Sequence, residues 1–136
     1  MTPEQIECVQ KSFAKVPQAA AAQIFYARLF QLAPNLRSLF RTDMNTQGER
    51  LMAIIAVAVN GLNDIERILP AVQDLGVRHA GYGVEPEHYE IVGSALLWTL
   101  EKGLGEDFTE DVRQAWAAAY GLLSSAMIEA AEDKAA

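Results

Sequence analysis

Apolar residues recur along most of the chain at spacings of three and four, which place side chains on one face of an α-helix. Alternating strand patterns joined by hairpin turns are not found. Thr2, Pro3 and Gln5 form a helix-start signal, and Thr109 is a cap for the last helix. The pattern predicts helices over about 3–16, 18–32, 34–40, 46–62 (capped by Asn45 or Thr46), a short segment after 63–64, a segment ending near Gly81, 86–103, and 110 onward.

These segments predict an all-α protein of about seven helices with short connections. The chain has no internal repeat, low-complexity tract or linker, so we expect a single domain over residues 1–136. Its composition of 51% hydrophobic and 21% charged residues is typical of a globular protein. The uneven helix lengths argue against a regular up-down bundle.

Charge and hydropathy exclude several classes of function. The net charge is −7 and no basic stripe is present, so nucleic-acid binding is disfavoured. The longest apolar run, residues 51–59, is too short to cross a membrane. The N-terminus shows no basic region followed by an apolar run, and the single cysteine cannot form an internal disulfide. We therefore expect a soluble cytoplasmic protein without a signal peptide.

One apolar stripe ends in a histidine and is the strongest candidate for chemistry. Its members, at i, i+3, i+6 and i+10, are Leu69, Val72, Leu75 and His79. Gly81 and Gly83 are natural residues to end this helix. A neutral imidazole in an apolar cavity is a good ligand for haem iron, although a lone histidine on such a face is often a plain core residue. If its second ring nitrogen donates to the Leu75 carbonyl, the tautomer is fixed.

Four segments in this order make the chain resemble the globin family over nearly its whole length. They are IFYARLF with APNLRSLF, QGERLM, LGVRHAGYGV, and HYEIVGSALLWTLEKGLGEDFTEDVRQAWAAAYGLL. The likeness is greatest to single-domain bacterial haemoglobins and the globin part of flavohaemoglobins, with neuroglobin close behind. The resemblance implies a globin fold around a haem b pocket. Because Gln47 follows Phe40 after only seven positions, the helix between the third and the distal helix is expected to be missing.

The resemblance assigns roles to particular residues. It makes His79 the proximal iron ligand, with Tyr26 and Gln47 binding the gas on the distal side. Other residues match positions around the haem: Phe40, Arg50, Leu51, Val84, Tyr89, Val92, Leu96, Tyr120 and Met127. A phenol and an amide are donors that stabilise iron-bound oxygen. The plain alternatives are a core tyrosine at Tyr26 and a solvated or capping glutamine at Gln47.

Two further residues have competing interpretations. His88 stands two residues after Pro86, in the first turn of a helix, where a solvated side chain is expected rather than an iron ligand. Arg50 matches a position that reaches haem propionates, and otherwise it would be a solvated partner of Glu49 or Glu66.

The proximal side departs from the flavohaemoglobin pattern. In that branch, a glutamate late in the last helix joins the tyrosine that corresponds to Tyr89 in bonding the proximal histidine. The matching position here is Ala131, and Glu129 and Glu132 lie about 200° and 100° away around the helix. We therefore expect His79 to have a neutral partner.

The expected function is reversible binding of oxygen and other diatomic gases, such as NO and CO, with no catalytic residue assigned. Oxygen storage or transport would use the pocket alone, whereas nitric oxide dioxygenation would need electrons from a separate reductase. No G-x-G-x-x-G nucleotide motif occurs in the chain. The alternative is a globin-like sensor or interaction module, with or without haem.

Overall fold

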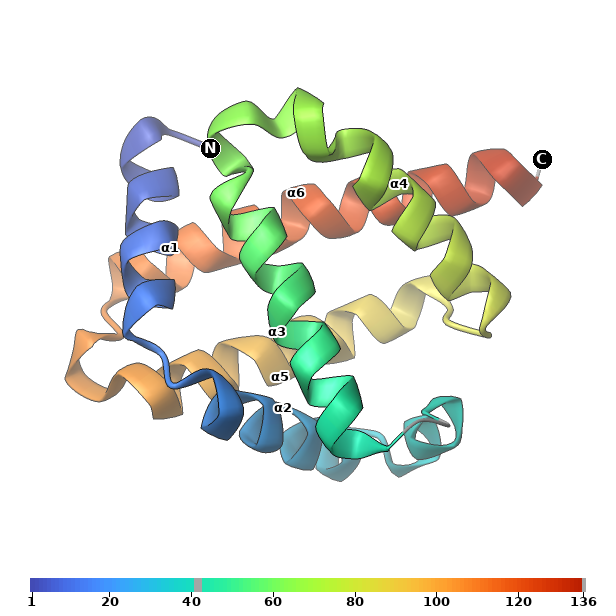
Figure 1. Ribbon diagram of the computed structural model, residues 1–136, viewed down its shortest axis with the longest axis horizontal. Coiled ribbons are helices and arrows are strands. Elements are labelled where there is room, and N and C mark those ends of the chain that lie inside the picture. Colours follow the sequence, from blue (N-terminus) through green and yellow to red (C-terminus); the bar gives the residue numbers. More distant parts are fainter. Residues whose placement is uncertain (41–42, 136) are drawn as a thin grey trace.

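The computed structural model describes residues 1–40 and 43–135, and these residues form helices without a strand (Figure 1). The helices are α1 (Pro3–Lys15), α2 (Gln18–Leu32), η1 (Pro34–Leu39), α3 (Met44–Asn60), η2 (Leu62–Asp64), α4 (Ile65–Gly81), α5 (Pro86–Leu104), η3 (Gly105–Asp107) and α6 (Glu110–Ala135). The all-α prediction is confirmed. Only four positions separate η1 from α3, so there is no room for a helix between them, as expected.

Side chains cap the first helix and α3 at their N-termini. Thr2 and Gln5 form the predicted capping box, each side chain bonding the other residue's backbone N–H at 3.1 and 3.0 Å. The prediction for α3 was wrong by two residues, because the Asp43 carboxylate accepts the Thr46 N–H at 3.1 Å. Asp43 thus caps α3 in place of Asn45 or Thr46, and the helix begins earlier.

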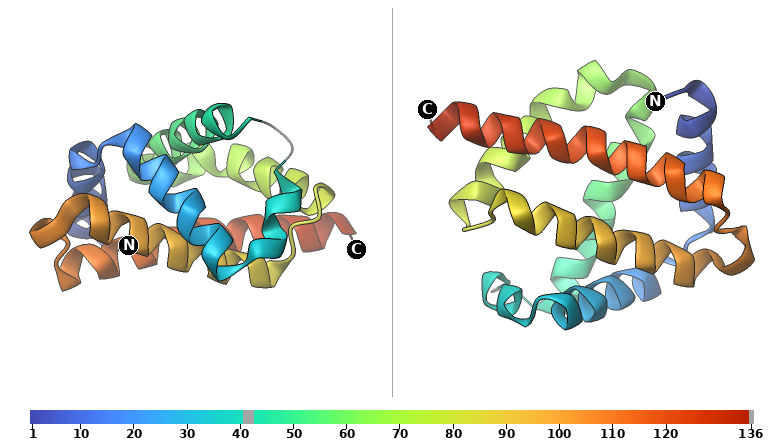
Figure 2. Two further views of the ribbon diagram at one scale, coloured as in Figure 1. Left: turned by 90° about the horizontal axis from the view of Figure 1, so that it is seen from below. Right: turned by 180° about the vertical axis from the view of Figure 1, so that it is seen from behind.

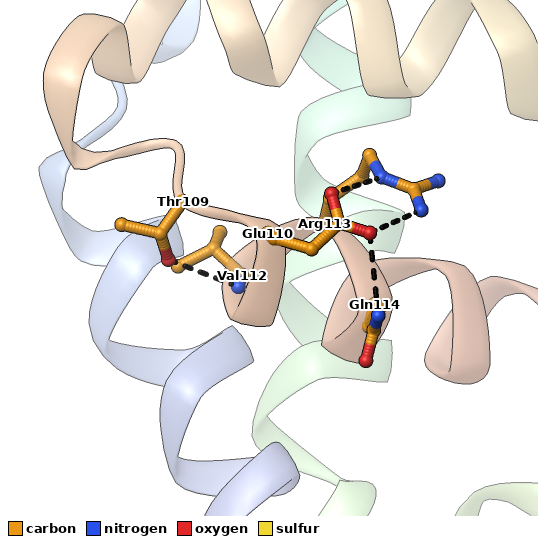
Figure 3. Close-up of polar contacts among 5 residues, drawn as sticks. All are labelled: Thr109, Glu110, Val112, Arg113 and Gln114. Carbon is orange, nitrogen blue, oxygen red and sulfur yellow. Dashed lines mark hydrogen bonds and ion pairs between the residues drawn. The ribbon is translucent and has the colours of Figure 1, made fainter.

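The start of α6 is stabilised by a local polar network (Figure 3). The Thr109 hydroxyl accepts the Val112 N–H at 3.3 Å, which confirms Thr109 as the cap. Arg113 donates to both carboxylate oxygens of Glu110, at 3.0 and 2.6 Å, and Gln114 donates to the same carboxylate at 3.2 Å. An acidic residue in the first turn also interacts favourably with the helix dipole.

The long helices pack around two adjoining apolar clusters. α5 and α6 lie side by side, and α2 packs against α5 and α3 (Figures 1 and 2). The larger cluster joins α1, α2, α3, α5 and α6 and contains Trp116, whose indole N–H donates to the buried Ser12 hydroxyl at 2.8 Å. The second cluster joins α2, η1, α3 and α5 and is centred on Leu29. Leu122 of α6 is 45% exposed.

Helix α4 is packed differently from the others. It contacts α6 extensively, yet Gly76 is its only buried residue. A Cβ atom at Gly76 would lie 2.3 Å from the Met127 carbonyl oxygen, so the two backbones touch. The apolar stripe of α4, with Val72 and Leu75, is only half-buried. The other described helices therefore leave the apolar face of α4 partly uncovered.

No helix within the described residues combines the length and the apolar character needed to cross a membrane.

Candidate functional site

The second apolar cluster brings together four of the predicted pocket residues around Tyr26. Phe40, Leu51, Val92 and Leu96 pack against it from η1, α3 and α5. Tyr26 itself is only 7% exposed, and its ring centroid lies 5.3 Å from that of Phe40 in an edge-on arrangement. Residues that are far apart in the sequence therefore form one apolar wall with a phenol in it.

The side chains of Tyr26 on α2 and Gln47 on α3 lie close enough to influence one another. Burial raises the pKa of the Tyr26 hydroxyl, and the nearby Gln47 side chain only partly opposes this. The hydroxyl therefore stays protonated at neutral pH and is able to donate. Gln47 lies half-buried in the first turn of α3, where its backbone N–H bonds the Asp43 carbonyl at 2.9 Å. The two proposed distal residues are thus neighbours.

On α4, His79 is held by both its side chain and its backbone. The ring Nδ1 lies 2.9 Å from the Leu75 carbonyl oxygen, the bond expected from the helix register. A carbonyl can only accept, so Nδ1 carries the proton and Nε2 is left with a free lone pair. The His79 carbonyl accepts the N–H groups of Tyr82 and Val84, both at 3.0 Å. The Leu75 bond orients the imidazole, and the two backbone bonds hold the turn that follows α4.

The environment of His79 favours a neutral imidazole. Burial lowers its pKa, the Leu75 hydrogen bond opposes this, and the positive charge of Arg78 lowers the pKa further. No carboxylate is among the groups that shift it. Glu129 and Glu132 are exposed on α6, whereas Ala131 is half-buried.

Three predicted pocket residues lie away from the cluster around Tyr26. Tyr89 and Tyr120 lie between α5 and α6, and Met127 lies at the α4–α6 contact. The Tyr120 hydroxyl donates to the Tyr89 carbonyl at 2.6 Å, and its ring lies so close to Gly93 that an added Cβ would be 2.7 Å away. Tyr89 and Tyr120 both line an open groove of about 640 Å³ between α5 and α6. Met127 meets Gly76 through its backbone. The structure therefore does not bring these three residues to the cluster around Tyr26.

Of the two residues with competing interpretations, Arg50 lies at the surface and His88 is half-buried. Arg50 is exposed, and within residues 1–40 and 43–135 it makes no ion pair with Glu49 or Glu66. The His88 Nδ1 accepts the Glu85 N–H at 2.9 Å and so serves as part of a helix cap. This bond confirms that His88 has a local structural role.

Sequence reasoning missed two features near the site. A small apolar cavity of about 20 Å³ lies beside Leu51 and Leu96, on the side facing Trp116. Its lining comes from several helices, so no local pattern could reveal it. Tyr82 is 67% exposed with its ring centroid 6.4 Å from the His79 ring. An aromatic residue between two glycines in the turn was the available signal for Tyr82.

Comparison with known proteins places this arrangement in a family. The globin family model matches residues 23–127. Flavohaemoproteins of Bacillus subtilis and Chromobacterium violaceum are 38% and 34% identical to the chain, over 80% and 94% of it. The chain spans only 28% and 33% of their lengths.

Solved structures of other proteins have the same fold as this chain. An engineered carbene transferase from Rhodothermus marinus superposes with a TM-score of 0.87 at 24% identity, covering 98% of this chain and 94% of that one. The carbon monoxide form of haemoglobin from Mustelus griseus gives a TM-score of 0.81 at 17% identity, covering 93% of this chain and 97% of that one. With the family match over residues 23–127, these findings show that the chain belongs to the globin family.

Proposed function

We propose that this chain is a haem-binding globin domain that binds oxygen and other diatomic gases reversibly, with iron held by His79. The observation that carries the proposal is the 2.9 Å bond from the His79 ring to the Leu75 carbonyl. It leaves a neutral, oriented nitrogen on a helix whose apolar face is only half covered. A neutral imidazole of fixed tautomer is a good ligand for haem iron.

The residues on the two sides fit a flat apolar macrocycle. Val72 and Leu75 of α4 present half-buried apolar side chains, and Phe40 and Leu51 supply apolar walls from the Tyr26 cluster. Bound haem b would supply an iron with four ring nitrogens and one open position for the gas. Arg50, exposed and without an ion pair within the described part of the chain, is suited to a propionate.

Tyr26 and Gln47 supply the gas selectivity. Each is a neutral donor, and their side chains are neighbours. Bound oxygen carries partial negative charge, so each donor stabilises it by about 1–3 kcal/mol in a dry pocket. Carbon monoxide is much less polar and gains less from the same donors. This arrangement favours oxygen and slows its release.

Nitric oxide dioxygenation is the second candidate. The observation that favours it is the buried, protonated Tyr26 hydroxyl, which would retain oxygen long enough for nitric oxide to reach it. The reaction consumes electrons, so a reductase would have to supply them. Oxygen storage or transport in the cytoplasm would need the pocket alone.

Two histidine variants test the proposal. His79→Ala, purified without imidazole after expression with added haem, should lose the haem absorption band near about 400 nm. His88→Ala is the matched control and should keep it, because His88 only caps α5. An unchanged band in His79→Ala would refute the iron assignment. A wild-type protein that takes up no haem at all would instead favour the haem-free interaction module.

The proximal partner is tested separately. With the Leu75 carbonyl as its partner, the bond between His79 and iron should be of ordinary strength, which suits reversible binding better than peroxide cleavage. Resonance Raman spectra of the reduced protein measure that bond. Ala131→Glu should raise its stretching frequency, and a wild-type frequency in the peroxidase range would contradict the proposal.

A further inference from the structure

Charge is distributed very unevenly along this acidic chain. Residues 8–42 contain no Asp or Glu and five basic residues, whereas the rest of the chain holds all 18 acidic residues and six basic ones. Lys11 and Lys15, on α1, are each neutralised by an acidic partner, Glu7 and Asp107. The charge that is left over therefore lies on α2 and η1, and Arg41 of the same segment is outside the described residues.

The arginines of α2 and η1 stand over aromatic rings instead of acids. The Arg28 guanidinium lies 4.0 Å from the Trp98 ring centroid, and the Lys102 ammonium lies 4.5 Å from the same ring. Arg37 lies 5.1 Å from the ring of Phe30. None of these three cations makes an ion pair within the described residues. Cation–π contacts hold them in place while leaving their charge uncompensated.

These cations flank a helix face that is neutral and open. Gln23, Ala27 and Gln31 are exposed at four-residue spacing and form the outward face of α2, which no other helix covers in Figures 1 and 2. Arg28 lies about 100° to one side of Ala27 around the helix. Phe30, which Arg37 covers, lies about 60° to the other side. A surface with a neutral centre and cationic side chains at its edges is suited to association with an acidic protein.

The same surface lies directly outside the proposed gas pocket. The Phe30 ring centroid is 5.6 Å from that of Phe40 and 6.0 Å from that of Tyr26. A single layer of aromatic side chains thus separates Arg37 from the wall of the pocket. Electron exchange between proteins requires such a short path, and the encounters are small and sensitive to salt.

We infer that the outward face of α2, with Arg28 and Arg37 at its edges, docks an acidic electron-carrier protein. The inference rests on the proposed function, because it assigns that carrier as the source of electrons. The carrier loses one electron, the haem iron gains it in passing from ferric to ferrous, and no proton is needed. The two arginines attract and orient the carrier, while the neutral centre of the face avoids repulsion.

The test is binding of a small acidic flavodoxin as the probe, measured by calorimetry and by NMR shifts of this protein at about 20 and 500 mM NaCl. Arg28→Glu/Arg37→Glu is compared with Arg67→Glu/Lys134→Glu, which makes the same change in net charge at exposed positions on α4 and α6. We expect the first pair to weaken binding at least about tenfold at low salt and the control less than about threefold. At high salt the difference should vanish.

Several results would overturn the inference. They are equal weakening by both pairs, NMR shifts that avoid residues 23–37, or no binding by the wild type at low salt. If the charge reversal unfolds the protein, Arg28→Gln/Arg37→Gln replaces it in the comparison. We expect this neutral variant to weaken binding less than the charge reversal would, but more than the control pair does. Absorption spectra of the same samples separate the two proposals. A haem band without binding refutes this surface alone, and binding without a haem band refutes the proposed function.

Discussion

The contact between α4 and α6 allows a sharp test of the fold, in the variant Gly76→Ala. The new Cβ would lie 2.3, 2.5 and 2.7 Å from the carbonyl oxygen, Cα and carbonyl carbon of Met127. Ordinary contacts need about 3.5 Å, so the helices must separate by about 1 Å. Because the clash is with backbone, no change of rotamer relieves it.

The expected magnitude follows from two opposing terms. Overpacking of a tight contact costs about 1–3 kcal/mol, and this backbone clash belongs at the upper end. Alanine in a helix interior recovers about 0.5–1 kcal/mol relative to glycine. We therefore expect Gly76→Ala to lower the free energy of unfolding by about 2 kcal/mol, measured by urea denaturation.

Gly121→Ala is the matched control. Gly121 also lies inside a helix, yet a Cβ built there meets nothing within 4 Å. It should stabilise the protein by about 0.5–1 kcal/mol through helix propensity alone. If Gly76→Ala is as stable as Gly121→Ala, the close α4–α6 contact is wrong. Haem uptake by Gly76→Ala should fall as well, since His79 follows three residues later on the displaced helix.

Three other changes test particular contacts. Ser12→Ala should cost about 1–3 kcal/mol in urea denaturation, because the buried Trp116 indole N–H loses its acceptor. In stopped-flow measurements, oxygen should leave Tyr26→Phe faster than Gln47→Leu, since the phenol is the stronger donor and is more deeply buried; the reverse order would contradict the proposed pocket. Burial lowers the pKa of His79, so the unfolded state binds more protons than the folded state below the ordinary pKa of about 6.5. Stability of the haem-free protein should therefore fall as the pH drops below that value, and His79→Gln should reduce this fall.

Most of the fold was predictable because each helix is defined by signals within its own stretch of sequence. The bounds of α2, Gln18–Leu32, coincide with those predicted from its apolar spacing and from Pro34 after it. The start of α3 was predicted two residues late because Asp43, Asn45 and Thr46 are all favourable N-cap residues. The local sequence does not show which of them caps the helix. Tertiary packing selects Asp43.

The candidate site was predictable only in part, for a physical reason. Tyr26, Phe40 and Leu51, which the resemblance to the globin family placed around the haem, do pack in one apolar cluster. The rotation of α6 depends instead on long-range contacts, such as the Tyr120 ring against Gly93. A helix rich in alanine has no strong apolar face, so the orientation of α6 could not be predicted from the sequence.

The sparse burial of α4 has a consequence for how the protein assembles. Both apolar clusters can close without α4, which adds only Gly76 to the buried residues. Its amide groups should therefore exchange with solvent fastest among the long helices, through local opening that leaves the rest of the molecule folded. If haem binds His79 as proposed, its supply should then determine when a newly made chain completes the docking of α4.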